Sequence, residues 1–138
     1  ARGEAAGMLT PGSHGTTFGG NPLATRAALA VLDTMQQDDL VAAAGARGRQ
    51  LLAGFRDRLG ELPGIVSIRG LGMMIGIELD RPCAELVGNA LNRGLLINVT
   101  AERVVRLLPP LITTEHQAEM IIEKVSELIQ EFLTETNT

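Results

Sequence analysis

The sequence contains few aromatic residues, one cysteine, and neither tryptophan nor tyrosine. Three phenylalanines are its only large aromatic side chains, so leucine, isoleucine, valine, methionine and alanine must form the core. A single cysteine excludes an internal disulfide and a thiolate cluster for a metal ion. The sequence has no basic run, carries a net charge of −4 and offers almost no aromatic stacking groups, so nothing favours nucleic-acid binding.

Long apolar runs are also absent. No stretch approaches the roughly 20 apolar residues that cross a bilayer, and no leader pattern opens the chain, so we expect a cytoplasmic protein. Cys83 is expected as a half-buried packing residue near a helix start. His14 and His116 lie too far apart in sequence to suggest metal ligands, and the adjacent Ser13 and His14 give no evidence of a nucleophile held against a base.

Lysine is as rare as cysteine. Lys124 is the only one, and it lies among Glu123, Ser126 and Glu127 in a strongly helical pattern. These neighbours are typical of a solvated helix surface. We therefore expect Lys124 to be a surface residue without a chemical role.

Apolar periodicity predicts about four helices and four strands, in a chain of 138 residues that suits one core. Residues 1–20 show no sustained period and are expected as a loop. Helices are expected near 21–35, 38–62, 82–94 and 114–133, and strands near 65–68, 73–79, 95–99 and 104–108. Neighbouring strands backed by helices predict an α/β fold of two layers, with a small, mostly antiparallel sheet.

Polar residues at the expected helix ends fix several boundaries. Asn21 and Pro22 suit the N-cap and first position of a helix, and Asp38 can cap the next one. The alternative is a single helix bent near Gln37. Thr114 has the capping-box spacing to Gln117.

Glycine, proline and apolar spacing predict the remaining features. Pro63-Gly64 should end the second helix, Arg69 to Gly72 should form a turn or bulge, and Gly94 should end the third helix. That third helix is expected to turn an apolar face inward, formed by Ala84, Val87, Ala90 and Leu91.

Two segments contain residue types suited to binding an anion. The loop over residues 12–20 contains glycines that admit a ligand close to the backbone, and the hydroxyls of Thr16 and Thr17 can donate hydrogen bonds, a combination that suits a phosphate. Arg106 is the one charged residue in an apolar strand, where a guanidinium can grip a carboxylate with two hydrogen bonds. An ordinary connecting loop and an arginine that reaches solvent are the alternatives.

The loop Gly15-Thr16-Thr17-Phe18-Gly19-Gly20-Asn21-Pro22 and the strand Val104-Val105-Arg106-Leu107-Leu108-Pro109-Pro110 closely resemble segments of the class-III, pyridoxal-phosphate-dependent aminotransferases of fold type I. The segment Val66 to Gly76 resembles the strand-turn-strand of that family's small C-terminal domain.

The resemblance implies specific roles for these residues. Thr17, with Thr16, would reach the phosphate of a cofactor bound in the other subunit of a homodimer. Arg106 would bind a substrate carboxylate. Residues 1–37 would end the large cofactor domain, and residues 38–138 would form the small domain. Phe18 stands where many members have Tyr.

Within this family, the sequence of the loop most resembles enzymes that transfer the terminal amino group of N-acetylornithine to 2-oxoglutarate in arginine biosynthesis. Succinylornithine, ornithine and 4-aminobutyrate are the alternative amine substrates. No catalytic residue is assigned in this chain, because the Schiff-base lysine is expected upstream of residue 1 in a longer protein. A chain without that lysine is expected to be inactive alone. The alternative of another class is a non-catalytic module that binds a carboxylate or a partner.

Overall fold

The computed structural model describes residues 2–8, 10–12 and 15–135. By their internal contacts, Ala1–Asp38 and Asp39–Thr138 form two units. This division falls within a residue of the expected boundary. The assignment of the first unit to a cofactor domain stays a prediction. Among the described residues, no helix combines the length and the apolar character that crossing a bilayer requires.

The first unit contains two helices, α1 (Glu4–Met8) and α2 (Pro22–Gln37), and buries none of the residues of either. The expectation that residues 1–20 lack a helix is wrong, because α1 forms one short turn there. Alanines and an acidic first turn favour such a turn, and five residues are too few to show a period. Helix α2 begins as predicted: the Asn21 side chain accepts a hydrogen bond from the Ala24 N–H at 3.0 Å.

Two adjacent aspartates separate α2 from α3 (Leu40–Leu59), so the alternative of one bent helix is wrong. The prediction that Asp38 caps the second helix is also wrong. Its N–H bonds to the Thr34 carbonyl and thereby ends α2. Asp39 precedes α3 in a left-handed conformation, with φ 47°, and its side chain makes no capping hydrogen bond.

The second unit contains a four-stranded antiparallel sheet in the order β1-β2-β4-β3. Its strands are β1 (Ile65–Leu71), β2 (Met74–Leu79), β3 (Asn98–Thr100) and β4 (Val104–Leu107). The turn or bulge predicted over Arg69–Gly72 is wrong in its position, since β1 stays regularly paired with β2 up to Leu71 and the reversal occurs at Gly72 and Met73. Gly72 has φ +53°, which suits this tight reversal. The strand predicted near residues 95–99 starts later, because the Leu95 N–H bonds back to the Ala90 carbonyl.

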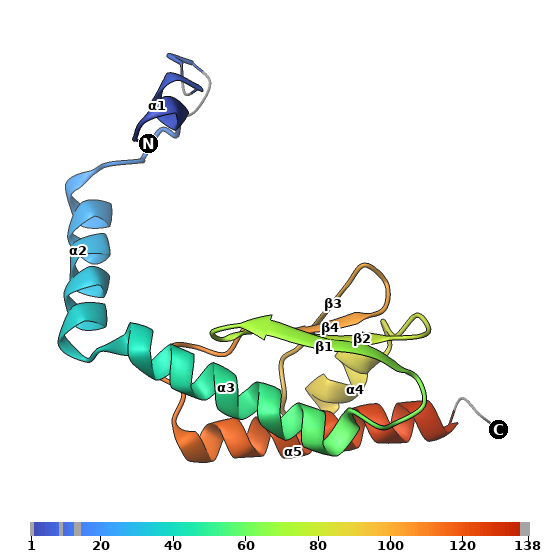
Figure 1. The fold of residues 1–138 in the computed structure, drawn as a ribbon. Coiled ribbons are helices and arrows are strands. Elements are labelled where there is room, and N and C mark those ends of the chain that lie inside the picture. The colour runs from blue at the N-terminus through green and yellow to red at the C-terminus, as the bar shows by residue number, and fades with distance from the viewer. Residues whose placement is uncertain (1, 9, 13–14, 136–138) are drawn as a thin grey trace. The chain divides into compact units, whose positions relative to one another are not determined.

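Helices α3, α4 (Leu86–Asn92) and α5 (Glu115–Glu135) all lie on one side of the sheet (Figure 1). Alternate residues of β2 point into this layer, and Ile75, Ile77 and Leu79 are fully buried. They pack with Phe55 of α3 and with the predicted apolar stripe of α5, which includes Ile122. The predicted two-layer α/β fold is confirmed.

Two helix predictions need correction. Helix α3 ends at Leu59 and Gly60, before the expected stop at Pro63-Gly64. In α4 the inward residues are Leu86 and Ala90, whereas Val87 and Leu91 are 39% and 61% exposed. The helix starts at Leu86, and residues four apart then share the face that meets the core.

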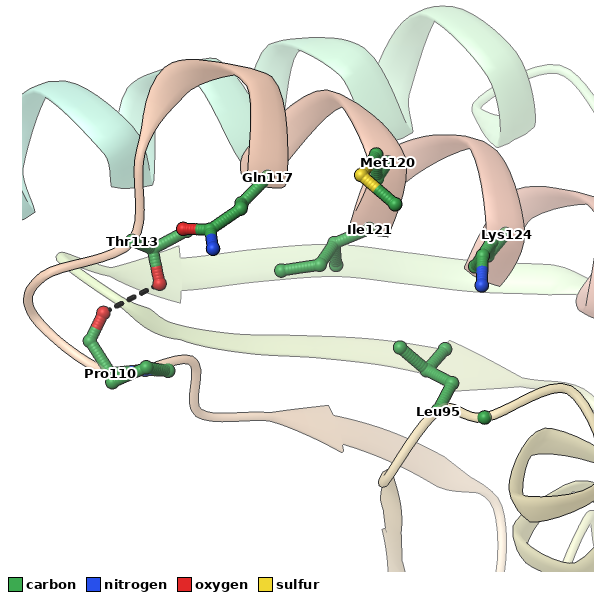
Figure 2. Close-up of a pocket in the computed structure, with 8 residues that line it drawn as sticks. Leu95, Pro110, Thr113, Gln117, Met120, Ile121 and Lys124 are labelled. Carbon is green, nitrogen blue, oxygen red and sulfur yellow. Dashed lines mark hydrogen bonds between the residues drawn. The ribbon is translucent and has the colours of Figure 1, made fainter.

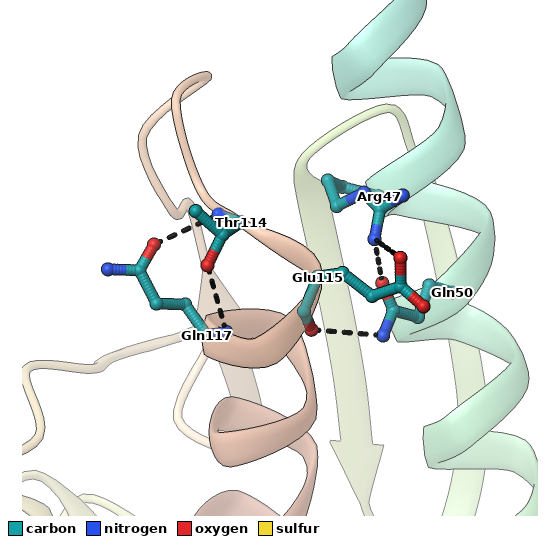
Figure 3. A network of polar contacts seen from close by, with 5 residues as sticks. All are labelled: Arg47, Gln50, Thr114, Glu115 and Gln117. Carbon is teal, nitrogen blue, oxygen red and sulfur yellow. Dashed lines mark hydrogen bonds and ion pairs between the residues drawn. The ribbon is translucent and has the colours of Figure 1, made fainter.

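A polar network joins the start of α5 to the side of α3 (Figure 3). Thr114 and Gln117 form the predicted capping box, with backbone-to-side-chain distances of 2.9 and 3.2 Å. Gln50 of α3 donates to the Glu115 carbonyl at 3.2 Å, and Arg47 pairs with the Glu115 carboxylate at 3.5 Å. These contacts set where α5 begins along α3 and so fix the layer beneath the sheet.

Candidate functional site

The face of the sheet that points away from the helices contains the predicted carboxylate-binding residue, Arg106. In β4 the side chains of Val105 and Leu107 enter the core, so Arg106 between them points to the open face and is exposed. Within the described residues, no hydrogen bond or ion pair engages its guanidinium. An arginine on a strand whose guanidinium N–H groups have no partner can bind a carboxylate through two parallel hydrogen bonds.

Glu78 of β2 is the centre of a charge cluster on the same face. Its carboxylate lies 2.7 Å from Nη1 of Arg69 and 3.0 Å from Nη2 of Arg103. Ser67 also donates to it at 3.3 Å and in turn accepts a hydrogen bond from Arg69. The hydrogen bond from Arg69 lowers the pKa of Glu78 below its ordinary value, and the nearby Arg103 charge adds to this effect against the opposing effect of burial. Glu78 is therefore ionised at neutral pH.

A hollow of about 360 Å³ lies between Arg69 and Arg106 on this face. Arg69 and Arg106 are on its border, Gly76 contributes backbone, and Met74 and Val104 are among the apolar residues that line it. A side chain at position 76 would project into this hollow. A Cβ built on Gly76 lies 3.5 Å from Val104 Cγ1 and 3.9 Å from Arg69 Cγ, and both residues line the hollow. The missing side chain keeps the space beside Arg106 open.

The predicted phosphate loop lies in the first unit and is organised by local hydrogen bonds. The Thr16 hydroxyl oxygen accepts from the Gly19 N–H at 3.0 Å, which leaves its own proton available. Asn21 donates to the Phe18 carbonyl at 2.6 Å while it caps α2. Thr17 is exposed, and no hydrogen bond occupies its hydroxyl within the described part of the loop. Both hydroxyls can therefore donate to an anion, whereas Ser13 and His14 lie outside the described residues.

The family described as aminotransferase class-III matches residues 1–129, which is nearly the whole chain. The chain belongs to the class-III aminotransferases. It is 53% identical over 135 residues to acetylornithine aminotransferase 1 of Bordetella bronchiseptica, covering 98% of this chain and 34% of that protein. It is 50% identical over 133 residues to the acetylornithine aminotransferase of Nitrosomonas europaea, covering 96% of this chain and 34% of that protein. This class-III chain thus spans about a third of the length of these relatives.

Solved structures of class-III aminotransferases have the same fold. The ornithine aminotransferase of Toxoplasma gondii superposes with a TM-score of 0.81 at 31% identity, over 94% of this chain and 32% of that one. The acetylornithine aminotransferase of Elizabethkingia anophelis gives a TM-score of 0.77 at 32% identity, over 91% and 33% of the two chains. The predicted resemblance to the class-III aminotransferases is thereby confirmed, and the assignment to their small C-terminal domain stays a prediction.

The single lysine of this class-III chain lies in the helix layer. Lys124 lines a hollow of about 370 Å³ together with Leu95, Met120 and Ile121 (Figure 2). Its Nζ donates to the Arg93 carbonyl at 3.3 Å, and the side chain is half-buried, where the sequence predicted a solvated residue. Helix α5 covers one side of the sheet (Figure 1), and Arg106 is exposed on the other side, so Lys124 is not placed to act at the Arg106 hollow.

Cys83 is fully buried, where the sequence predicted half-burial, and burial raises the pKa of its thiol, with a smaller contribution from Glu85. A buried thiol held in the neutral form is a packing residue. No group of three or more potential metal-ligating residues occurs within the described part of the chain.

Sequence reasoning found Arg106 but missed Glu78 and Gly76, and it gave Arg69 no role beyond anchoring a turn. Alternation in β1, β2 and β4 places these side chains on one face. Which of them are neighbours depends on the strand register, and the sequence pattern does not give that register.

Proposed function

We propose that this chain is the C-terminal part of a pyridoxal-phosphate-dependent aminotransferase that transfers the terminal amino group of N-acetylornithine to 2-oxoglutarate. The products are N-acetylglutamate semialdehyde and glutamate. The observation that carries the proposal is the 53% identity to an acetylornithine aminotransferase over 98% of this chain. A cytoplasmic enzyme of arginine biosynthesis is the matching cellular role.

The two candidate sites fit the charges that such a reaction presents. Two free hydroxyl protons in a glycine-rich loop, at Thr16 and Thr17, suit a phosphate. A free guanidinium beside an open hollow, at Arg106, suits a carboxylate. Both N-acetylornithine and 2-oxoglutarate carry a carboxylate that Arg106 can hold.

Each group has a defined task in the proposed mechanism. Pyridoxal phosphate, when bound, supplies the carbon that accepts the amino group and the conjugated ring that stabilises the charge left by the broken C–H bond. Thr16 and Thr17 donate hydrogen bonds to its phosphate and hold the ring in place. Arg106 fixes the substrate by its carboxylate, so that the reacting carbon keeps one orientation. The lysine that moves the proton is expected in the part of the protein upstream of this chain.

We also propose that the first unit completes a site in a homodimer. The α2 side chains Leu23, Val31 and Leu32 are 81%, 59% and 60% exposed, and neither helix of this unit buries a residue. These apolar side chains are spread around α2, and a helix that is apolar on several sides normally packs against other protein surface. The remaining two thirds of the enzyme and its second subunit would supply that surface.

Turnover of competing amines by the full-length enzyme tests the substrate. We expect N-acetylornithine to give the highest kcat/KM with 2-oxoglutarate, followed by N-succinylornithine, then ornithine and 4-aminobutyrate. Preference for 4-aminobutyrate would replace the proposed substrate. Absence of transamination with all four amines would favour the non-catalytic carboxylate-binding module.

Two substitutions in the full-length enzyme test the sites themselves. Thr17→Ala should weaken cofactor binding by about 1.5–3 kcal/mol, the contribution of a hydrogen bond to a charged group. Thr34→Ala is the matched control, because that hydroxyl donates to the Ala30 carbonyl within α2. Arg106→Lys should raise the KM for 2-oxoglutarate, since lysine loses the two-pronged geometry. Arg56→Lys on α3 controls for the chemical change, and equal effects of Arg106→Lys and Arg56→Lys would remove Arg106 from the site.

A further inference from the structure

One row of residues crosses all four strands on the open face of the sheet. Arg69 of β1 pairs with Gly76 of β2, Gly76 pairs with Arg106 of β4, and Arg106 pairs with Asn98 of β3. Strands lie about 4.8 Å apart, so the Cα atoms of Arg69 and Arg106 are separated by roughly 10 Å. Gly76 contributes no side chain between them, and two guanidinium groups therefore border one open hollow.

The two arginines differ in whether their charge is neutralised. Arg69 is 2.7 Å from the Glu78 carboxylate, and Arg103 binds the other oxygen of the same carboxylate at 3.0 Å. The Glu78 side chain is 18% exposed, against 55% for Arg69, so the acid is the more enclosed partner. Arg106 has no ion pair within the described residues. Glu78 thus occupies two of three neighbouring guanidinium groups and leaves the third unoccupied.

We propose that Glu78 is a positioning residue that determines how many carboxylates the Arg106 hollow accepts. By holding Arg69, the second arginine on the border of the hollow, it limits the hollow to one free cation and so to one carboxylate group. A second carboxylate close to the first would meet the negative charge of Glu78 and an arginine that is already occupied. Substrates consequently enter the hollow by a single carboxylate end. The proposal rests on the proposed function, because it takes Arg106 as the substrate-binding arginine.

Competition by small carboxylates in the full-length enzyme tests this role. Succinate is the probe with two carboxylates, butyrate is the probe with one, and the measured quantity is the ratio of their inhibition constants against the amino acceptor. Glu78→Gln keeps the size of the side chain but removes its charge. We expect it to shift the ratio about threefold to tenfold toward succinate, because Arg69 is no longer neutralised at this partly exposed site.

A double-substitution cycle separates this role from simple support of the fold. Arg69→Met alone should leave the ratio within about twofold of the wild type, since Arg69 is already neutralised. Combined with Glu78→Gln it should restore the wild-type ratio, and a structural defect would not be repaired by a second substitution. Glu78→Ala, which also removes the acceptor, should shift the ratio in the same direction.

The outcomes separate the two proposals. If Arg106→Gln weakens neither probe, the carboxylate site of the proposed function is wrong. If Arg106→Gln weakens both probes while Glu78→Gln leaves their ratio unchanged, only the role of Glu78 is overturned. Retention of the succinate gain in the double variant, or loss of folding in both Glu78 variants, would also overturn it and make Glu78 a structural residue.

Discussion

Gly48 in α3 packs directly against the turn between β1 and β2. A Cβ built on Gly48 would lie 2.1 Å from the carbonyl oxygen of Gly72, 2.6 Å from its carbonyl carbon and 2.9 Å from its Cα. All three are backbone atoms of a turn residue with φ +53°, so no flexible side-chain tip can move aside. The helix or the hairpin must shift to admit a methyl group.

The magnitude follows from two opposing effects. Alanine stabilises a helix interior by about 1 kcal/mol relative to glycine. Overpacking costs typically 1–3 kcal/mol, and a collision with backbone belongs at the upper end of that range. Gly48→Ala should therefore lower the free energy of unfolding by about 2 kcal/mol.

Gly45 provides the control within the same helix. A Cβ there would meet only Nη1 of Arg49, at 3.6 Å, which is an ordinary contact. Gly45→Ala should therefore raise the free energy of unfolding by up to about 1 kcal/mol. Urea unfolding of the full-length protein, followed by circular dichroism, should move the two midpoints in opposite directions. Equal shifts, or a Gly48→Ala variant as stable as the wild type, would refute the close contact between α3 and the hairpin.

Three further predictions concern helix caps and pH. Asn21→Ala should weaken the start of α2 by about 1 kcal/mol, measured as faster amide exchange at Ala24, because the N-cap hydrogen bond is lost. Thr114→Ala should lower the urea midpoint by a similar free energy, and Thr114→Ser should restore it. The hydrogen bond from Arg69 holds the pKa of Glu78 below 4.5, so its contribution to stability is present above that pH and is lost on acidification. When the pH is lowered below about 4.5, the melting temperature of the wild type should decrease, and that of Glu78→Gln should decrease less.

The features that the sequence predicted best depend on local interactions. The N-cap at Asn21 and the capping box at Thr114 need only residues three positions away, and both form. The alternating apolar face of β2 also depends on spacing alone, and Ile75 and Ile77 are buried as that spacing predicts. The α5 stripe likewise packs into the core.

The wrong predictions depend on competition between partners along the chain. Arg69 to Gly72 has turn-forming glycines, but pairing with β2 keeps Arg69 and Gly70 in the strand. Asp38 is a good N-cap residue by type, yet its N–H already ends α2. Leu95 suits a strand, but its N–H closes α4. In each case a hydrogen bond to another element decides between two locally acceptable conformations.

The candidate site, like the fold, could be predicted from the sequence only in part. Arg106 stood out because it is a lone charge in an apolar strand, a property that is visible in sequence. The sequence does not show which arginines the nearby acid neutralises: Glu78, which lies 28 residues earlier, pairs with Arg69 and Arg103 and not with Arg106. Gly76 matters only because the register puts it between two arginines. A free cation beside open backbone is therefore a product of strand pairing, and it is this pairing that turns an arginine in a strand into a candidate carboxylate site.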